Sequence, residues 1–375
     1  MTSAPGAGRL PQVVMVAQRP PPTHGQAVAN ATLLDAHYDR LGVHPVEMEF
    51  SKGLDDVSRF RLGKLVELIR VALEIFRQRL RGHHDVLFYS VGLRNRTGLY
   101  RDMLLLLLAR PFFRRTVLHV HTGGTGALVA GLPGPLRALA ERAYGGAHMV
   151  IYLDPFLLDG DTGMPSPRRH VFVPYGVEPQ EVGTAQASGR PIEILFVGNL
   201  YESKGTLEMV EAAGKLRAQG IDFRLTMAGG RPDEATGRRL EQAIDDAGIA
   251  DRTELPGVVG VEEKAGLYTR SDIFCFPTHY EAEGMPLVIL EAMSAGLPVV
   301  STSWRSIPNV VTDGHDGALV APGDTDALAQ HLAQLSTDET CRQAMGSAAR
   351  DTFDRRFSPQ RFVAEVERAV LESVS

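Results

Sequence analysis

Short apolar runs alternate with longer amphipathic stretches along the first half of the chain. Residues 27–41 and 58–81 have the apolar spacing of helices. The runs between and beyond them read as buried strands, at residues 12–17, 46–50, 85–90, 115–120, 149–152 and 170–173. Strands that alternate with helices at this spacing predict parallel βαβ units, rather than an all-β or all-α domain.

The second half repeats this pattern more regularly. Strands are expected at residues 192–197, 222–228, 253–255, 273–276 and 298–301, and helices at residues 204–219, 233–247, 262–268 and 286–295. Residues 178–191 lack apolar periodicity and are rich in small and polar side chains, which is typical of a linker. The expected organisation is therefore an N-terminal domain (1–177), a linker (178–191), a C-terminal domain (192–355) and a last helix (356–375) that packs back toward the N-terminal domain.

Two α/β domains agree with the length of the chain. At 375 residues it exceeds the size at which one hydrophobic core usually keeps growing. Ligands of open parallel sheets bind outside the carboxyl ends of the strands, so we expect a site in a cleft between the domains. Neither half carries a GxGxxG after its first strand, which argues against a dinucleotide site.

Composition excludes several classes of protein. The two cysteines, Cys275 and Cys341, lie in no metal-binding spacing, which favours a reducing, cytoplasmic location. The N-terminus lacks the apolar segment of a secretory signal, and the longest apolar run, residues 103–109, is far too short to span a bilayer. A net charge of −6 without a concentrated basic face argues against nucleic-acid binding.

The stretch EAEGMPLVILEAMSAGLPVV, residues 281–300, carries the candidate chemistry. Pro286 suits the first position of a helix and Gly296 the position just past its end. Glu283 then lies immediately before the helix and Glu291 in its second turn, beside N–H groups that attract phosphate. Such a site fits a ligand with hydroxyls and phosphates. In the alternative interpretation, the acidic residues before the helix only complement its dipole and Glu291 is solvated.

A longer segment, FPTHYEAEGMPLVILEAMSAGLPVV, resembles the glutamate-x7-glutamate signature of the retaining glycosyltransferases of the GT-B fold, especially family 4. FVGNLYESKG (196–205), LTMAGG (225–230), LPGVVGVEEKAGLYTRSDIFCFPT (255–278) and VFVPYGVEP (171–179) resemble further segments of that family. The resemblance covers residues 170–325 well and the N-terminal half thinly. It implies an α/β GT-B fold, in which two Rossmann-like domains face an interdomain cleft.

The resemblance also implies roles for individual residues. In the family the first glutamate contacts sugar hydroxyls and the second contacts the ribose, which are Glu283 and Glu291 here. His121, at the end of a strand, matches a family histidine beside the donor sugar, whereas His119 is expected in the core. The implied catalytic residues are Glu283 and His121, and the implied donor-binding residues are Gly25, Asn199, Lys204, Gly229, Arg231, Met285, Pro286, Leu287, Val288 and Glu291.

Two positions depart from the family pattern. Asn199 stands where the family often has an arginine on the donor diphosphate, and Tyr175 stands where it often has an asparagine. Lys204 must then neutralise more of the diphosphate charge, or Arg231 must help. No metal and no cofactor are expected, because the acidic motif at 159–161 fits a glycine-rich turn and the histidines at 83–84 immediately precede a strand.

The implied activity is retaining transfer of a sugar from a nucleotide-sugar donor to a hydroxyl of a glycan or a lipid-linked saccharide, in polysaccharide or glycoconjugate biosynthesis. A sugar-nucleotide epimerase of the same fold, a phosphorylase that would need pyridoxal phosphate, and a catalytically silent sugar-nucleotide-binding subunit are the alternatives.

Residues 58–82, SRFRLGKLVELIRVALEIFRQRLRG, combine seven basic residues with apolar ones. One interpretation is a helix on an anionic membrane surface, which would place the protein peripherally at the inner face of the membrane. The other is a helix packed on the sheet with its arginines reaching into solvent, and the interruption of the basic face by Glu67 and Glu74 favours it.

Overall fold

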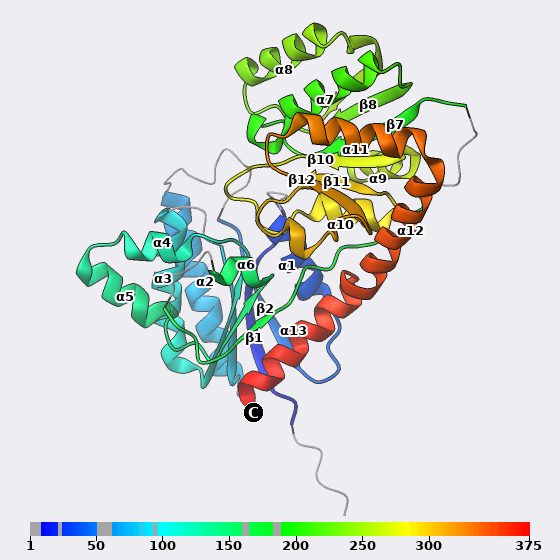
Figure 1. Cartoon of the computed structure of the whole chain (residues 1–375). Coiled ribbons are helices and arrows are strands. Elements are labelled where there is room, and N and C mark those ends of the chain that lie inside the picture. Colours follow the sequence, from blue (N-terminus) through cyan, green and yellow to red (C-terminus); the bar gives the residue numbers. More distant parts are fainter. Residues whose placement is uncertain are drawn as a thin grey trace, which may run out of the picture. The chain divides into compact units, whose positions relative to one another are not determined.

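The computed structural model describes residues 9–21, 25–50, 62–82, 84–92, 96–159, 165–182 and 189–375 (Figure 1). The chain divides into two compact units. The first comprises Met1–Tyr175 together with Pro359–Ser375, and the second comprises Gly176–Ser358. Each unit is an α/β domain with its own parallel sheet.

The first unit is built on a six-stranded parallel sheet of order β2-β1-β3-β4-β5-β6. Its strands are β1 (Gln12–Gln18), β2 (Gly42–Met48), β3 (Val86–Val91), β4 (Arg115–Val120), β5 (Met149–Tyr152) and β6 (His170–Phe172). All six residues of β3 and all four of β5 are buried. Strands buried on both faces explain why they read as continuous apolar runs in the sequence.

Helices cover the sheet of the first unit (Figure 1). They are α1 (Gly25–Asp35), α2 (Leu62–Arg81), α3 (Arg96–Ala109), the 3₁₀ turn η2 (Arg110–Phe112), α4 (Thr125–Ala130), α5 (Gly134–Tyr144), α6 (Pro155–Asp159) and α13 (Pro359–Val374). The last of these, α13, contacts β4 and β5 although it follows the second unit in the chain. Its buried residues Phe362, Val366 and Val370 recur every four positions and form its packing face.

The second unit also holds a six-stranded parallel sheet, of order β12-β11-β10-β7-β8-β9. Its strands are β7 (Ile192–Val197), β8 (Phe223–Ala228), β9 (Thr253–Gly257), β10 (Ile273–Phe276), β11 (Val299–Thr302) and β12 (Gly317–Val320). Its helices are α7 (Thr206–Ala218), α8 (Glu234–Asp246), α9 (Val261–Arg270), α10 (Leu287–Ser294), α11 (Thr325–Thr337) and α12 (Glu339–Arg356), with 3₁₀ turns η3 (Glu202–Lys204), η4 (Ala250–Arg252) and η5 (Ile307–Asn309).

Several element boundaries differ from those expected from the sequence. Helix α1 ends at Asp35 rather than at residue 41, and the Tyr38 hydroxyl donates back to the Leu33 carbonyl in its last turn. Strand β2 covers residues 42–48 rather than 46–50 and includes Pro45, which an edge strand tolerates. Strand β12 and helices α11 and α12 were not assigned from the sequence.

Two boundaries near the candidate site also differ. Lys204 does not open a helix: it ends η3, and Gly205, at φ +81°, separates it from α7. Pro286 is the N-cap of α10, with an extended ψ of 112°, rather than its first helical residue. Both differences arise from local turns, which the spacing of apolar residues does not predict.

Part of the expected linker, residues 183–188, lies outside the described residues. The same is true of residues 58–61, 83 and 160–161 of the motifs considered above, and of residues 22–24, which immediately precede Gly25. The described part of 178–191 packs on the second unit, where the Gln180 N–H donates to Ser294 Oγ at 2.9 Å. No helix in the described part of the chain is both long and apolar enough to cross a bilayer.

Candidate functional site

The topology of the second sheet marks one place for a ligand. From β7 the chain proceeds outward through β8 to β9, then returns to the other side of β7 with β10. The loops that leave the carboxyl ends of β7 and β10 therefore diverge, which is the arrangement that opens a ligand crevice in α/β sheets. Lys204 lies in the first of these loops, and Glu283 and Pro286 lie in the second.

Lys204 is drawn into this region instead of pointing into solvent. The loop can take this path because residue 205 is a glycine. Any other residue there would place its Cβ 2.1 Å from the Pro277 carbonyl oxygen. The Lys204 Nζ is 2.5 Å from Glu283 Oε2, and the two side chains are only 14% and 9% exposed. The same ammonium lies 4.7 Å from the centre of the Tyr280 ring, within the range of a cation–π interaction.

Glu283 is held by its own loop as well as by Lys204. The Thr278 hydroxyl donates to Glu283 Oε2 at 3.0 Å, and the Glu283 N–H donates to the Tyr280 carbonyl at 3.0 Å. Both side-chain contacts use Oε2. A carboxylate fixed through one oxygen can present its other oxygen to ligand hydroxyls.

The start of α10 provides backbone donors next to this carboxylate. Pro286, the N-cap, makes no side-chain cap, and the first N–H groups of a helix have no partner inside the helix. Leu287 and Val288 occupy the first two helical positions, and Met285 is buried just before them. Their N–H groups and the positive end of the helix dipole suit a phosphate.

Glu291 lies one turn further along α10 and is anchored from α9. It accepts from Lys264 Nζ at 2.7 Å and from the Tyr268 hydroxyl at 2.9 Å. Burial, followed by the nearby Glu291 carboxylate, raises the pKa of Tyr268 well above its usual value, so the hydroxyl remains a donor. Glu291 is therefore a positioned carboxylate rather than a solvated one, at 12% side-chain exposure.

The ends of β7 and β8 approach each other closely. A Cβ on Gly229 would lie 1.8 Å from the Gly198 carbonyl oxygen, so only glycine permits the contact. Asn199 follows Gly198 and is exposed. Arg231 is held elsewhere, because its Nη1 pairs with Glu241 Oε1 of α8 at 2.7 Å. In this structure Arg231 is therefore paired with Glu241, whereas Glu283 is paired with Lys204.

The remaining predicted site residues lie at the strand ends of the first unit. His121 follows β4 and is buried, with Nε2 2.8 Å from Ser90 Oγ and Nδ1 2.7 Å from the Tyr175 hydroxyl. His119 is fully buried, as expected of a core residue, and neither ring nitrogen has a partner in the described part of the chain. Burial lowers the pKa of His119 to about 3.

A polar network connects His121 to the start of α1, where Gly25 is the first residue. Ser90 Oγ donates to Asn30 Oδ1 at 2.9 Å and accepts from Gln26 Nε2 at 3.2 Å. Sequence reasoning missed Ser90, Asn30 and Gln26. The position of Ser90, next to last in an otherwise apolar strand, was the available signal.

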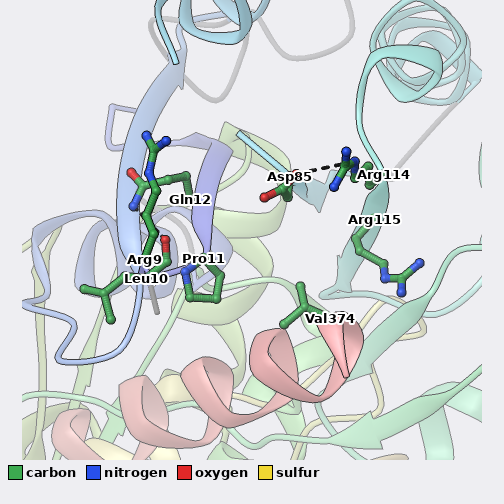
Figure 2. A pocket seen from close by; sticks show the side chains of 8 residues that line it. All are labelled: Arg9, Leu10, Pro11, Gln12, Asp85, Arg114, Arg115 and Val374. Atoms are coloured by element: carbon green, nitrogen blue, oxygen red, sulfur yellow. Dashed lines mark hydrogen bonds and ion pairs between the residues drawn. The ribbon is translucent and has the colours of Figure 1, made fainter. Parts of the chain in front are cut away.

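Two other observations limit where ligands could bind. Within the described residues no group of three or more His, Cys, Asp or Glu side chains could hold a metal ion. A cavity of about 530 Å³ lies in the first unit at the opposite edge of the sheet, where β1 and β4 begin (Figure 2). It lies where strands of this sheet begin, whereas His121 follows the carboxyl end of β4. The lining residues of the cavity are Arg9, Leu10, Pro11, Gln12, Asp85, Arg114, Arg115 and Val374.

Residues 181–352 match the family model described as glycosyl transferases group 1. Amylovoran biosynthesis glycosyltransferase AmsK of Erwinia amylovora is 34% identical over 189 residues, which are 49% of this chain and 46% of the relative. D-inositol 3-phosphate glycosyltransferase of Paenarthrobacter aurescens is 32% identical over 255 residues, 67% of this chain and 59% of the relative. The matched stretches thus span less than two thirds of these relatives' own length.

Solved structures extend the likeness to nearly the whole chain. Sucrose-phosphate synthase of Thermosynechococcus elongatus has a TM-score of 0.73 at 17% identity, over 98% of this chain and 100% of the other. Anabaena HepE, solved with UDP-glucose, has a TM-score of 0.72 at 15% identity, over 96% of this chain and 99% of the other. At such identities the structures show the shared GT-B fold. Residues 181–352, which match the family model, thus belong to the glycosyl transferases group 1 family, family 4 of the GT-B glycosyltransferases.

Proposed function

We propose that the protein is a retaining, metal-independent glycosyltransferase, which moves a sugar from a nucleotide-sugar donor to a hydroxyl of a glycan or lipid-linked saccharide. The observation that carries this proposal is the partly buried Lys204–Glu283 pair beside the start of α10, at the switch point between β7 and β10. The family of residues 181–352 and the names of the relatives, which include amylovoran and capsular polysaccharide biosynthesis enzymes, support a role in polysaccharide or glycoconjugate biosynthesis.

Departure of the nucleoside diphosphate is the step that these residues would assist. Negative charge grows on the leaving phosphate as the glycosidic bond breaks. The Lys204 ammonium and the N–H groups of Leu287 and Val288 would stabilise that charge in a partly buried site, where fixed donors act more strongly than in water. Asn199 and Gly229 would line the phosphate side of this site. The acceptor hydroxyl would attack on the face from which the diphosphate leaves, with a phosphate oxygen as base, as the family resemblance implies.

The ion pair suggests how binding would rearrange the site. A diphosphate would draw Lys204 from Glu283, because a doubly charged ligand attracts the ammonium more strongly than one carboxylate does. Glu283 would then accept hydrogen bonds from the sugar hydroxyls. Glu291, already oriented by Lys264 and Tyr268, would accept from the ribose hydroxyls. Positioning of this kind lowers the entropic part of the barrier.

Residues of the first unit would contribute to the donor sugar and the acceptor. We propose that His121 positions the donor sugar and that Gly25 admits the donor close to the backbone at the start of α1. Ser90 and Tyr175 fix the His121 ring, which prepares its orientation. Cys275 and Cys341 are both free, which agrees with action in a reducing compartment, the cytoplasm.

Donor binding and turnover of the Lys204→Ala variant test this proposal. We screen UDP-, GDP-, dTDP- and ADP-sugars by thermal shift, since a ligand that binds only the folded chain raises its stability. For the donor that binds, Lys204→Ala should weaken affinity on the order of 10- to 100-fold, the effect of one charge-assisted hydrogen bond. Lys215→Ala, which removes an α7 lysine paired with Asp326, is the matched control. Equal affinity in the two variants contradicts the proposal.

A catalytically silent sugar-nucleotide-binding subunit is the second candidate, because Asn199 brings no charge to the diphosphate. The two functions differ in slow hydrolysis of the donor without acceptor. A transferase releases nucleoside diphosphate and the Glu283→Gln variant releases much less, whereas a binding subunit releases none. An epimerase would instead convert the sugar of the intact donor, which chromatography of the nucleotide sugar detects.

A further inference from the structure

Helix α2 has two apolar faces, and the described residues cover only one of them. Val71 and Ile75 are fully buried in the first unit. Val66, Ile69 and Leu73 recur at intervals of three and four, and therefore share a different face of the helix. With Leu65 and Leu80 they are among the most exposed apolar side chains of the described residues, since Val66, Leu73 and Leu80 are 67%, 63% and 88% exposed. A helix packed only on a sheet would place polar residues on this outer face.

Helix α3 and turn η2 extend this uncovered surface. Tyr100, Leu104 and Leu108 lie four residues apart on α3 and are each about two fifths exposed. Helix α2 contacts α3, and right-handed crossovers from β2 to β3 and from β3 to β4 place both helices on the same side of the sheet. We call this surface the apolar face; its members are Leu65, Val66, Ile69, Leu73, Leu80, Tyr100, Leu104, Leu108 and Phe112.

The end of α2 is fastened to η2, so these parts form one surface. The Phe76 and Phe112 rings meet edge to face with centroids 4.8 Å apart. Arg79 Nε donates to the Phe112 carbonyl at 2.7 Å. Phe112 is itself half exposed, so it adds an aromatic side chain to the apolar face near Leu80.

The stretch of sequence that carries the apolar face is strongly positive. Residues 62–115 contain eleven Lys and Arg and four Asp and Glu, a balance of +7. Glu67 and Glu74, which interrupt the basic pattern in the sequence, are neutralised by Arg70 and Arg77 at 2.7 and 3.1 Å and are mostly shielded from solvent. Asp102 is fully buried against Arg101.

Further arginines continue the positive charge beyond η2. Arg114 is 85% exposed and lies 3.8 Å from the fourth acidic residue, Asp85. Figure 2 shows Arg9, Arg114 and Arg115 around the cavity at this edge of the sheet. Arg81 lies in the last turn of α2, one residue after Leu80, and Arg114 follows Phe112 by two residues, so both are next to members of the apolar face in the chain.

We propose that the apolar face docks the first unit on an anionic lipid surface. The apolar side chains would enter the boundary between headgroups and acyl chains, and the surrounding arginines would pair with lipid phosphates. A second copy of the chain fits less well, because it would bring together two stretches that each carry an excess of positive charge. Docking of this kind goes beyond the proposed activity and does not depend on it.

Vesicle co-sedimentation of the full chain tests the proposal without any donor. Wild type should bind mixed phosphatidylcholine–phosphatidylglycerol vesicles more strongly than pure phosphatidylcholine vesicles, and salt should weaken this preference. Because the three side chains are exposed, the triple variant Val66→Ser, Leu73→Ser, Leu80→Ser should keep its fold, as thermal unfolding can show. It should lose vesicle affinity on the order of tenfold or more.

Val258 and Val261 supply the matched control, since they are 82% and 83% exposed in the second unit. Their double serine variant should bind vesicles as wild type does. Failure of wild type to bind the mixed vesicles overturns the proposal, and so does unchanged binding by the triple variant. If light scattering shows a wild-type dimer that the triple variant converts to a monomer, the apolar face joins two copies and the lipid proposal is wrong. Donor binding by Lys204 is measured separately, so either proposal can fail without the other.

Discussion

At the scale of residues, two carboxylates beside the start of α10 are each paired with a lysine. Lys204 with Glu283 and Lys264 with Glu291 are two ion pairs around the start of α10. Each carboxylate also accepts from a hydroxyl, of Thr278 or of Tyr268. Partly buried charges need such partners, because desolvation without them costs several kcal/mol. In the proposed function, the same pairs would hold the carboxylates in place for hydroxyl groups of a donor.

His119 should make the stability of the first unit depend on pH. Its folded-state pKa of about 3 lies below the ordinary 6.5 because of burial. Between these values the unfolded chain binds a proton that the folded chain does not, so stability is full above pH 6.5 and falls as pH drops toward 3, by up to about 1.4 kcal/mol per pH unit. His119→Phe should remove this part of the fall in stability at low pH. Urea unfolding at several pH values measures the free energy of unfolding of the variant and of wild type.

Exposed His37 offers the control for this experiment, since a phenylalanine there leaves the buried ring untouched. The His37→Phe variant should follow the wild-type pH profile. If His119→Phe follows it as well, His119 is protonated in the folded chain and the inference about its burial is wrong.

At the scale of elements, turns rather than helices decide where the site residues lie. The apolar runs predicted most of the strands in both sheets, because buried parallel strands are recognisable from composition alone. The contact of Lys204 with Glu283, 79 positions apart, could not be predicted by periodicity, since it depends on β10 lying beside β7. The same holds for Ser90 and His121, which meet because β3 and β4 are neighbours.

The glutamate pair was easier to predict than its surroundings. Glu283 and Glu291 are close in sequence, and a single helix start relates them, so spacing alone placed both near the N-terminus of α10. The N-cap position of Pro286 and the pairing of Arg231 with Glu241 depend on local turns and on a neighbouring helix. Neither has a signature in the sequence pattern.

Gly205 is the turn residue on which the position of Lys204 depends. Gly205→Ala would place a methyl 2.1 Å from the Pro277 carbonyl oxygen, at a φ of +81°. The positive φ alone costs about 1–2 kcal/mol in a non-glycine residue, and the clash must displace the backbone in addition. We expect the free energy of unfolding to fall by more than this and donor affinity to fall with it.

Gly220→Ala separates the cost of the positive φ from the cost of the clash with Pro277. Gly220 has a similar φ of +74°, but an added Cβ there would have nothing within 4 Å. Chemical denaturation should show a smaller loss of stability for this variant, with unchanged donor affinity. Equal losses in the two variants would mean that the contact with Pro277 does not constrain the loop.

At the scale of the whole molecule, the last helix belongs to the first unit although the second unit precedes it in the chain. Phe362 of α13 lies among first-unit residues, with ring centroids 6.0 Å from His119 and 6.1 Å from Tyr175. Phe362→Ala should lower the free energy of unfolding of the first unit by about 3–5 kcal/mol, the usual cost of removing a buried phenylalanine. Calorimetry with and without a bound nucleotide measures this, since the proposed donor site should still stabilise the second unit in the variant.

Arg368→Ala, at an exposed position of the same helix, should leave both units unchanged. An equal destabilisation of both units by Phe362→Ala would show that they unfold as one body, whereas no destabilisation of the first unit would mean that α13 does not contribute to its core.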